Sequence, residues 1–311
     1  MDTATDLYPS RGEGPIAPIE RHTPVVYPGP QRDAGPLSPQ ALAQYEKDGY
    51  LFLESLFHET EVEALQREMD ALRGNEKVRQ SEIAVTEALS GEIRSIFAVH
   101  TVSDIFRTLA ADRRLLGIVR QILGSDVYLH QSRVNYKPGF RGKEFYWHSD
   151  FETWHCEDGL PEMRTVSCSI ALTPNYPYNG PLMVMPGSHR HFFPCEGHTP
   201  EDHYLQSLKK QDYGVPNDEQ LQWMADRFGI VAPLGPVGSV TLFDCNLMHG
   251  SNGNITPYPR SNAFFVYNST ENLLEEPFAA AHRRPWYLGN RSPEPLEETE
   301  FVPGEAAPAL S

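Results

Sequence analysis

The stretch from residue 127 to residue 267 constrains the fold most, because short β-rich runs alternate there with Gly, Pro and Asn. In one run, RTVSCSIALT, every second residue is apolar: Val166, Cys168, Ile170 and Leu172. This period of two predicts a β-strand with one buried face. Further strands are expected at residues 182–185, 238–243 and 263–267. Many short strands joined by turns predict a mainly β fold, a sandwich or jelly roll.

Helices are expected around this core. Ser38 and Pro39 predict a helix start, with Ser38 as the N-cap, and that helix extends to about Lys47 before Gly49 ends it. Tyr50 opens a short predicted strand. Apolar spacing or a following Gly predicts three more helices, which cover residues 62–72, 112–123 and 217–228.

The 311 residues fit one large domain, and no internal repeat is visible. Residues 1–37 are rich in Pro, Gly and charge, so we expect a flexible arm or a segment lying on the surface. Residues 38–290 are expected to form a single domain with N-terminal helices and a β core. Residues 291–311 are acidic and contain Pro, and we expect a loose tail there.

The net charge of −16 argues against nucleic acid and anionic membranes as partners, because both need a basic footprint. No run of 18 apolar residues predicts a membrane span, and the N-terminus lacks the features of a secretory signal. Four cysteines without a CxxC pair are typical of reduced thiols. We therefore expect a cytoplasmic protein.

The densest chemistry lies in the run FYWHSDFETWH, residues 145–155. His148 and Asp150 are two residues apart, and on an extended strand such residues point to the same side. His249 follows a predicted strand far downstream and offers a second imidazole. Two His and one carboxylate on one face of a metal form the facial triad of non-haem Fe(II) oxygenases. A surface His beside a solvated Asp is the alternative for the His-x-Asp pair alone.

A cation follows the second His at a short distance. Arg260 lies eleven residues after His249, at the start of the next predicted strand, and its fork suits the distal carboxylate of a 2-oxo acid co-substrate. A surface charge at a strand edge is the alternative. His189 and His191 resemble a zinc pair, but no thiolates match them, and we expect a structural role. His155 is expected to face away from the metal.

The sequence resembles the phytanoyl-CoA hydroxylase-like dioxygenases and, more narrowly, the ectoine hydroxylases among them. The resemblance covers about residues 36–290, and PGSH at residues 186–189 is shared broadly among such enzymes. The narrower match lies in HQSRVNYKPGF, FYWHSDFETWH, EDGLP, NGPL and NAFFVYN, which begin at residues 130, 145, 157, 179 and 262.

The resemblance implies a double-stranded β-helix (jelly-roll, cupin-like) core wrapped by helices, and a homodimer. It implies Fe(II), 2-oxoglutarate and O₂ as cofactor and co-substrates, and hydroxylation of ectoine to 5-hydroxyectoine in compatible-solute biosynthesis. Related halogenases carry a small residue at the position of Asp150, so the carboxylate argues for hydroxylation. The implied metal ligands are His148, Asp150 and His249. The implied 2-oxoglutarate contacts are Arg260, Lys137 and Asn135, and the implied substrate contacts are Gln131, Trp154 and Arg284.

The chemistry of ectoine is consistent with these residues. A small ring with an amidinium and a carboxylate needs an aromatic face and an anion-binding donor. Trp154, Phe264 and Tyr267 are candidates for the aromatic face, and Arg284 for the donor. Two alternatives stay open: a related dioxygenase acting on another small zwitterion, and a cupin-like metal protein that binds or isomerises its ligand without O₂ chemistry.

Overall fold

A computed structural model of the chain describes residues 6–13, 17–86, 91–200 and 214–303. Its largest element is an antiparallel seven-stranded sheet. In spatial order this sheet contains β2 (Tyr50–Leu53), β10 (Val240–Asp244), β7 (Thr165–Ala171), β12 (Arg260–Ser269), β5 (Val127–Lys137), β4 (Ile93–Phe97) and β3 (Ala84–Thr86).

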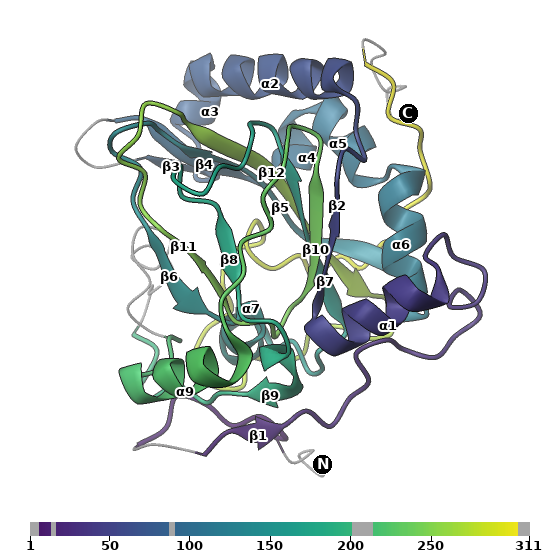
Figure 1. Cartoon of the computed structure of the whole chain (residues 1–311), viewed down its shortest axis with the longest axis vertical. Helices are drawn as coiled ribbons and strands as arrows, with labels where there is room; N and C mark the ends of the chain where they lie inside the picture. The colour runs from purple at the N-terminus through teal and green to yellow at the C-terminus, as the bar shows by residue number, and fades with distance from the viewer. Residues whose placement is uncertain (1–5, 14–16, 87–90, 201–213, 304–311) are drawn as a thin grey trace.

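A three-stranded antiparallel sheet lies beside it and completes the jelly-roll core (Figure 1). This sheet contains β6 (Phe145–His148), β11 (His249–Ser251) and β8 (Leu182–Val184). A further pair, β1 (Ile19–Glu20) and β9 (His191–Phe192), lies at the bottom of the view in Figure 1. The expected mainly β, jelly-roll fold class is confirmed.

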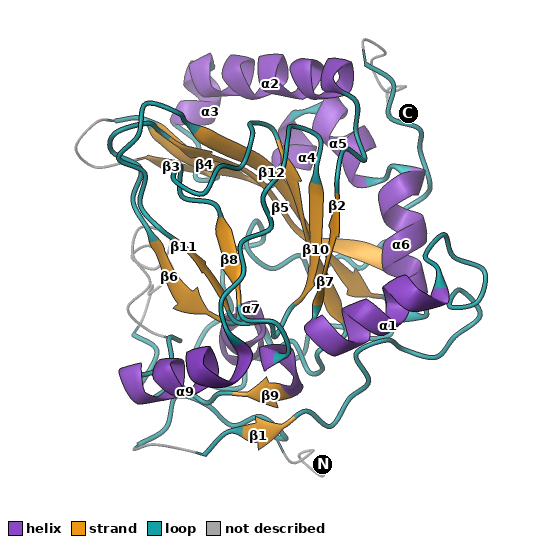
Figure 2. Cartoon of the chain, in the orientation of Figure 1, coloured by secondary structure: helices purple, strands orange, loops and turns teal. Residues whose placement is uncertain are grey.

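Helices cover one face of the large sheet (Figure 2). These are α1 (Pro39–Asp48), α2 (Glu59–Gly74), α3 (Glu76–Arg79), α4 (Val99–Val102), α5 (Asp104–Ala110) and α6 (Arg113–Leu123). The other face and its connections carry α7 (Asp150–Thr153), the π-helical turn η1 (Trp154–Asp158), the 3-10 turn η2 (Ser188–Arg190) and α9 (Asp218–Phe228). No helix in the described ranges is both long and apolar enough to cross a membrane.

Local sequence signals placed several of these elements correctly. Ser38 accepts a hydrogen bond from the Ala41 amide at 3.2 Å and so caps α1. Gly49 ends that helix at a φ of 77°, a left-handed conformation that Gly adopts without a steric penalty. The predicted helix at residues 62–72 is part of the longer α2, whose C-cap is Asn75 and not Gly74.

The alternation of side chains along the large sheet separates two hydrophobic clusters, one on each face of the sheet. In β12, Phe265 packs into the core between the sheet and the helices, while Phe264 and Val266 pack between the two sheets. Strand β7 follows the same rule, since Ile170 packs toward the helices. Its opposite face was expected to be exposed, but Ser167 and its neighbours are buried because the smaller sheet and its connections cover them.

The described parts of both terminal segments, residues 6–13 and 17–37 and residues 291–303, pack more closely than composition suggested. In the N-terminal segment Tyr8 is 1 % exposed and packs edge-on against Phe151, so the described part of this segment is not a loose arm. Near the C-terminus Phe301 is 5 % exposed, and the Thr299 amide donates to the Ala111 carbonyl at 2.9 Å. A few apolar side chains and backbone hydrogen bonds therefore hold these segments against the domain, although their overall composition is polar.

Candidate active site

Strands β6 and β11 bring the two predicted imidazoles together. His148 is the last residue of β6, His249 is the first residue of β11, and they are direct partners in the antiparallel pairing. The centroids of their rings are 4.3 Å apart. The pairing of two short strands thus brings side chains distant in sequence to one point.

Asp150 completes the group. It opens α7 rather than continuing β6, but the backbone of Ser149 stays extended, so the carboxylate still turns toward the imidazoles. Its oxygens lie 3.7 Å from Nε2 of His148 and 3.9 Å from Nε2 of His249. Ligand atoms of the three residues lie within 4.8 Å of one another, and no other such cluster of His, Cys, Asp and Glu is found in the described residues.

The hydrogen bonds of the imidazoles leave the same nitrogen of each ring for a metal. Nδ1 of His148 contacts the Tyr146 carbonyl at 2.7 Å, and Nδ1 of His249 contacts the Leu247 carbonyl at 2.9 Å. A carbonyl partner requires that Nδ1 carry the proton, so both Nε2 atoms are unprotonated acceptors in the neutral rings.

The local electrostatics favour the ionisation states that a cation needs. Burial opposes ionisation of Asp150, but the neighbouring His249, His148 and Arg133 outweigh it and hold its pKa well below the ordinary value. Burial and the adjacent His148 lower the pKa of His249 to about 4. An ionised carboxylate beside a neutral imidazole is the donor set of a divalent metal site.

The cluster lies in a cavity of about 150 Å³ between the two sheets. All nine residues that the sequence analysis assigned to the metal, to 2-oxoglutarate or to the substrate line this cavity: Gln131, Asn135, Lys137, His148, Asp150, Trp154, His249, Arg260 and Arg284. Phe264 also lines it. Tyr267 does not, and its expected place at an aromatic face is wrong: it lies in the helix-side core and donates to the Ala110 carbonyl at 2.8 Å.

Strand register builds one end of the cavity. Arg260 on β12 pairs with Lys137 on β5, and Asn262 pairs with Asn135 two residues along. Because side chains alternate along a strand, all four point to the same side of the sheet. Nζ of Lys137 donates to Oγ of Ser251 at 2.8 Å, and burial together with Arg260 and Arg94 lowers its pKa to about 6.

Arg260 has an unsatisfied donor at this end. Burial lowers the pKa of its guanidinium to about 10. Its Nε is buried and has no hydrogen-bond partner among the described residues. A buried donor without an acceptor is costly, and a small dianion in the cavity would supply the acceptor.

The opposite end holds the three remaining predicted residues. Trp154 is 3 % exposed and packs edge-on against His130, with ring centroids 5.1 Å apart. Arg284 forms two hydrogen bonds to Asp158, at 2.8 and 2.5 Å, which fix the plane of its guanidinium. Nε2 of Gln131 donates to the Leu288 carbonyl at 2.8 Å.

Sequence reasoning missed four charged residues that line the cavity: Arg94, Arg133, Lys143 and Glu157. Arg133 on β5 lies with its guanidinium carbon 4.1 Å from the centroid of the Phe264 ring. It belongs to the same alternation as Gln131 and Asn135, so the strand pattern could have found it. Arg94 on β4 and Glu157 in η1 also line the cavity. No local pattern marked Arg94, because only sheet pairing brings β4 beside β5.

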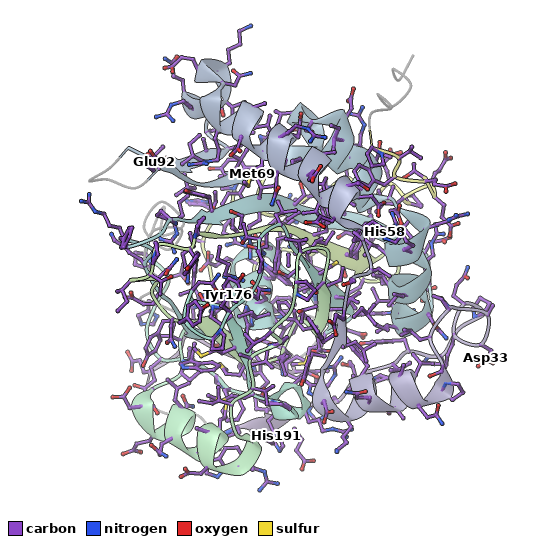
Figure 3. The ribbon with its side chains drawn as sticks, turned by 45° about the horizontal axis from the view of Figure 1, so that its top comes forward. Asp33, His58, Met69, Glu92, Tyr176 and His191 are labelled. Carbon is purple, nitrogen blue, oxygen red and sulfur yellow. The ribbon has the colours of Figure 1, made fainter. Side chains whose placement is uncertain are left out.

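The three histidines that the sequence analysis set aside do not line the cavity. His155 is buried away from the cavity, with Nδ1 2.7 Å from the Leu160 carbonyl. His191 lies next to α9 at the lower edge of the molecule, near Trp223 (Figure 3). Neither residue, nor His189, belongs to the metal-ligand cluster.

Known proteins share this architecture. The family model of phytanoyl-CoA dioxygenase (PhyH) matches residues 45–262. The ectoine dioxygenase of Sphingopyxis alaskensis is 55 % identical over 286 residues, which cover 92 % of this chain and 93 % of that protein. The ectoine dioxygenase of Streptomyces avermitilis is 53 % identical, covering 95 % of this chain and 100 % of that protein.

Solved structures with a similar fold include an enzyme of the same organism as the first relative. The crystal structure of EctD from S. alaskensis with 2-oxoglutarate and 5-hydroxyectoine is similar with a TM-score of 0.86 and 49 % identity, covering 96 % of this chain and 100 % of that chain. The same enzyme with bound Fe gives a TM-score of 0.85 at 48 % identity, with the same coverage. Across sequence, fold and the grouping of cavity residues, this chain belongs to the phytanoyl-CoA dioxygenase (PhyH) family.

Proposed function

We propose that this protein is an Fe(II)- and 2-oxoglutarate-dependent dioxygenase that hydroxylates ectoine to 5-hydroxyectoine in compatible-solute biosynthesis. The main support for this proposal is the composition of the cavity. Its His-Asp-His cluster lies between the guanidinium of Arg260, which has an unsatisfied Nε, and the side chains of Trp154 and Arg284. The identity of 52–55 % with relatives named ectoine dioxygenase supports the choice of substrate.

The donor set fits iron. His148 and His249 each offer an unprotonated Nε2, and Asp150 offers an ionised oxygen, which together form a facial triad. When bound, iron and 2-oxoglutarate would supply the O₂ activation that inserts one oxygen atom into a C–H bond and leaves succinate and carbon dioxide. Ser167 donates to Oδ2 of Asp150 at 3.1 Å and so orients the carboxylate.

Arg260, Lys137 and Asn135 are proposed to bind 2-oxoglutarate. The orphaned Nε of Arg260 and the adjacent Lys137 ammonium suit a distal carboxylate. Asn135 is held by Oγ of Ser95, which donates to its Oδ1 at 2.8 Å. This hydrogen bond fixes the side-chain amide of Asn135, so that β5 holds a polar group in a defined position beside the co-substrate.

Gln131, Trp154 and Arg284 are proposed to bind ectoine. The indole of Trp154 suits the amidinium, whose charge is attracted to an aromatic face. Asp158 holds two nitrogens of Arg284, which leaves the other edge of the guanidinium for the substrate carboxylate. Oε1 of Gln131 already accepts from Arg133 and has a second lone pair for a ring N–H.

The proposal extends to the organisation of the protein. We propose one dioxygenase domain over residues 38–290, with the terminal segments as extensions of it. A homodimer and a cytoplasmic location are proposed from the family resemblance and from four buried cysteines that are all free thiols. A role in osmoprotection would follow from the proposed product.

The test is succinate release by the protein loaded anaerobically with Fe(II), then given 2-oxoglutarate and O₂ with or without ectoine. We expect strong stimulation by ectoine and a product one oxygen atom heavier than the substrate. Succinate without stimulation by ectoine would reject the substrate and keep the dioxygenase. No succinate under any condition would reject the proposed chemistry.

A further inference from the structure

One buried cation near the cavity comes from the far N-terminal segment. This segment pairs through β1 with β9, at the bottom of the view in Figure 1. Arg11 lies on it, and its side chain is 1 % exposed. A buried guanidinium so far from its partners in sequence calls for a specific role, because burying a charge is costly unless it is fully paired.

Arg11 is fully engaged with two carboxylates. Its Nε and Nη2 form a fork on Glu152, at 3.0 and 2.8 Å. Its Nη1 donates to Oε1 of Glu157 and to Oγ1 of Thr199, the latter at 2.7 Å. Glu152 belongs to α7 and Glu157 to η1, so a single side chain ties both turns together.

The backbone of Arg11 is held in an unfavourable conformation. Its φ of 59° lies in the left-handed region, which residues other than Gly rarely adopt. Its amide donates to the Cys195 carbonyl at 2.7 Å, and the Cys195 amide donates to Oγ of Ser10 at 2.9 Å. Strain that the surroundings enforce tends to occur where a side chain must be aimed at a defined target.

The target lies at the substrate end of the cavity. Glu157 lines the cavity, and its Oε2 is 3.7 Å from Nε of Arg284. Glu157 is therefore shared between two guanidiniums, Arg11 behind it and Arg284 beside it. Without Arg11, the carboxylate would be attracted to Arg284 alone and would draw that guanidinium away from its place in the cavity.

We propose that Arg11 is a positioning residue that sets Glu157 and, through it, Arg284 for substrate binding. The inference rests on the proposed function, because it assigns Arg284 to ectoine. It predicts that substitution of Arg11 weakens the binding of ectoine but not that of 2-oxoglutarate. The side-chain hydrogen bonds of Arg11 go to Glu152, Glu157 and Thr199. Arg260 and Lys137 lie on other elements, β12 and β5, so binding of 2-oxoglutarate should not depend on Arg11.

Arg114 provides a matched control. Its Nε and Nη2 form a fork on Asp112, at 2.8 and 3.0 Å, and its Nη2 also lies 2.8 Å from Glu61. It too is an arginine held between two carboxylates, and none of these three residues lines the cavity. Substitutions of Arg114 should lower thermal stability without a change in ligand affinity.

The experiment compares Arg11→Lys and Arg11→Ala with Arg114→Lys and Arg114→Ala. Ectoine and 2-oxoglutarate are titrated calorimetrically into anaerobic protein loaded with Fe(II), and Tm is measured in parallel. For Arg11→Lys we expect the Kd for ectoine to rise about tenfold or more, because small misplacements of binding groups are costly. The Kd for 2-oxoglutarate should stay within about twofold of the wild type, since the groups proposed to bind it keep their contacts.

Glu157→Gln provides a second route if the Arg11 variants fold poorly. It keeps the shape of the side chain and removes the charge that Arg11 and Arg284 share, so it should reproduce the selective loss of ectoine affinity. Unchanged ectoine affinity in Arg11→Lys and Glu157→Gln, with only Tm lowered as in the Arg114 variants, would overturn the inference. If the wild-type protein showed no succinate release that ectoine stimulates, the proposed function would be rejected instead.

Discussion

Nδ1 of His148 and Nδ1 of His249 make the same hydrogen bond, each to the carbonyl two residues earlier in its own chain segment, at 2.7 and 2.9 Å. The two residues also face each other across β6 and β11. This symmetry fixes both tautomers and directs both Nε2 atoms toward Asp150. Backbone contacts therefore help to set the arrangement of the ligands.

Removal of either imidazole should abolish tight iron binding. We expect His148→Ala and His249→Ala to weaken Fe(II) binding by about a hundredfold or more. Replacement of a residue that only hydrogen-bonds to a metal ligand already lowers metal affinity by about 10- to 100-fold, and loss of the ligand itself should cost at least as much. Turnover should become undetectable. Anaerobic metal titration measures the affinity, and His191→Ala, next to α9 and outside the cluster, serves as the control. Tight iron binding by His249→Ala would contradict the triad.

Replacement of Arg260 should act on 2-oxoglutarate alone. Arg260→Lys keeps the charge and loses the fork, and a lost charged hydrogen bond of about 1.5–3 kcal/mol should raise KM for 2-oxoglutarate about 10- to 100-fold. Initial rates at saturating ectoine give this KM. The exposed Arg113, in Arg113→Gln, should leave it unchanged. An equal rise in KM for ectoine would show that the two ends of the cavity are not separate.

Binding of 2-oxoglutarate should take up a proton above about pH 6. Burial and two neighbouring guanidiniums lower the pKa of Lys137 to about 6 in the free protein, so its charged form is lost as pH rises through that value. A bound dianion favours the charged form and raises the pKa, so affinity should fall with rising pH from about 6. Calorimetry in buffers of different ionisation enthalpy measures the uptake. Lys137→Met should remove it, and uptake that persists in this variant would assign the proton to another group.

The C-terminal segment should contribute to stability and not to the site. Phe301 is 5 % exposed, so Phe301→Ala should lower the free energy of unfolding by about 3 kcal/mol. The neighbouring Val302 is 41 % exposed, and Val302→Ala should change stability by no more than about 0.5 kcal/mol. Denaturant unfolding compares the two. Equal effects would indicate that the segment is loose in solution.

Local patterns in the sequence predicted several helices and strands and the three metal-ligand candidates, whereas most other cavity residues came from the family resemblance. The Ser38 cap, the Gly49 stop and the alternation in β7 each depend on residues a few positions apart. The run from His148 to Asp150 was recognisable for the same reason. The physical argument for it was only partly correct, since the strand ends at His148 and a helix begins at Asp150.

Tertiary structure decided which distant segments meet. The pairing of β11 with β6 brings His249 beside His148, and the pairing of β4 with β5 brings Arg94 into the cavity. The position of Arg11 behind Glu157 follows from packing between segments about 150 residues apart, and nothing in the polar composition of residues 1–37 marked it. Periodicity and capping are short-range properties of the chain, whereas register between strands and the pairing of buried charges depend on the whole fold, which is why the sequence alone determined the former and only the structure the latter.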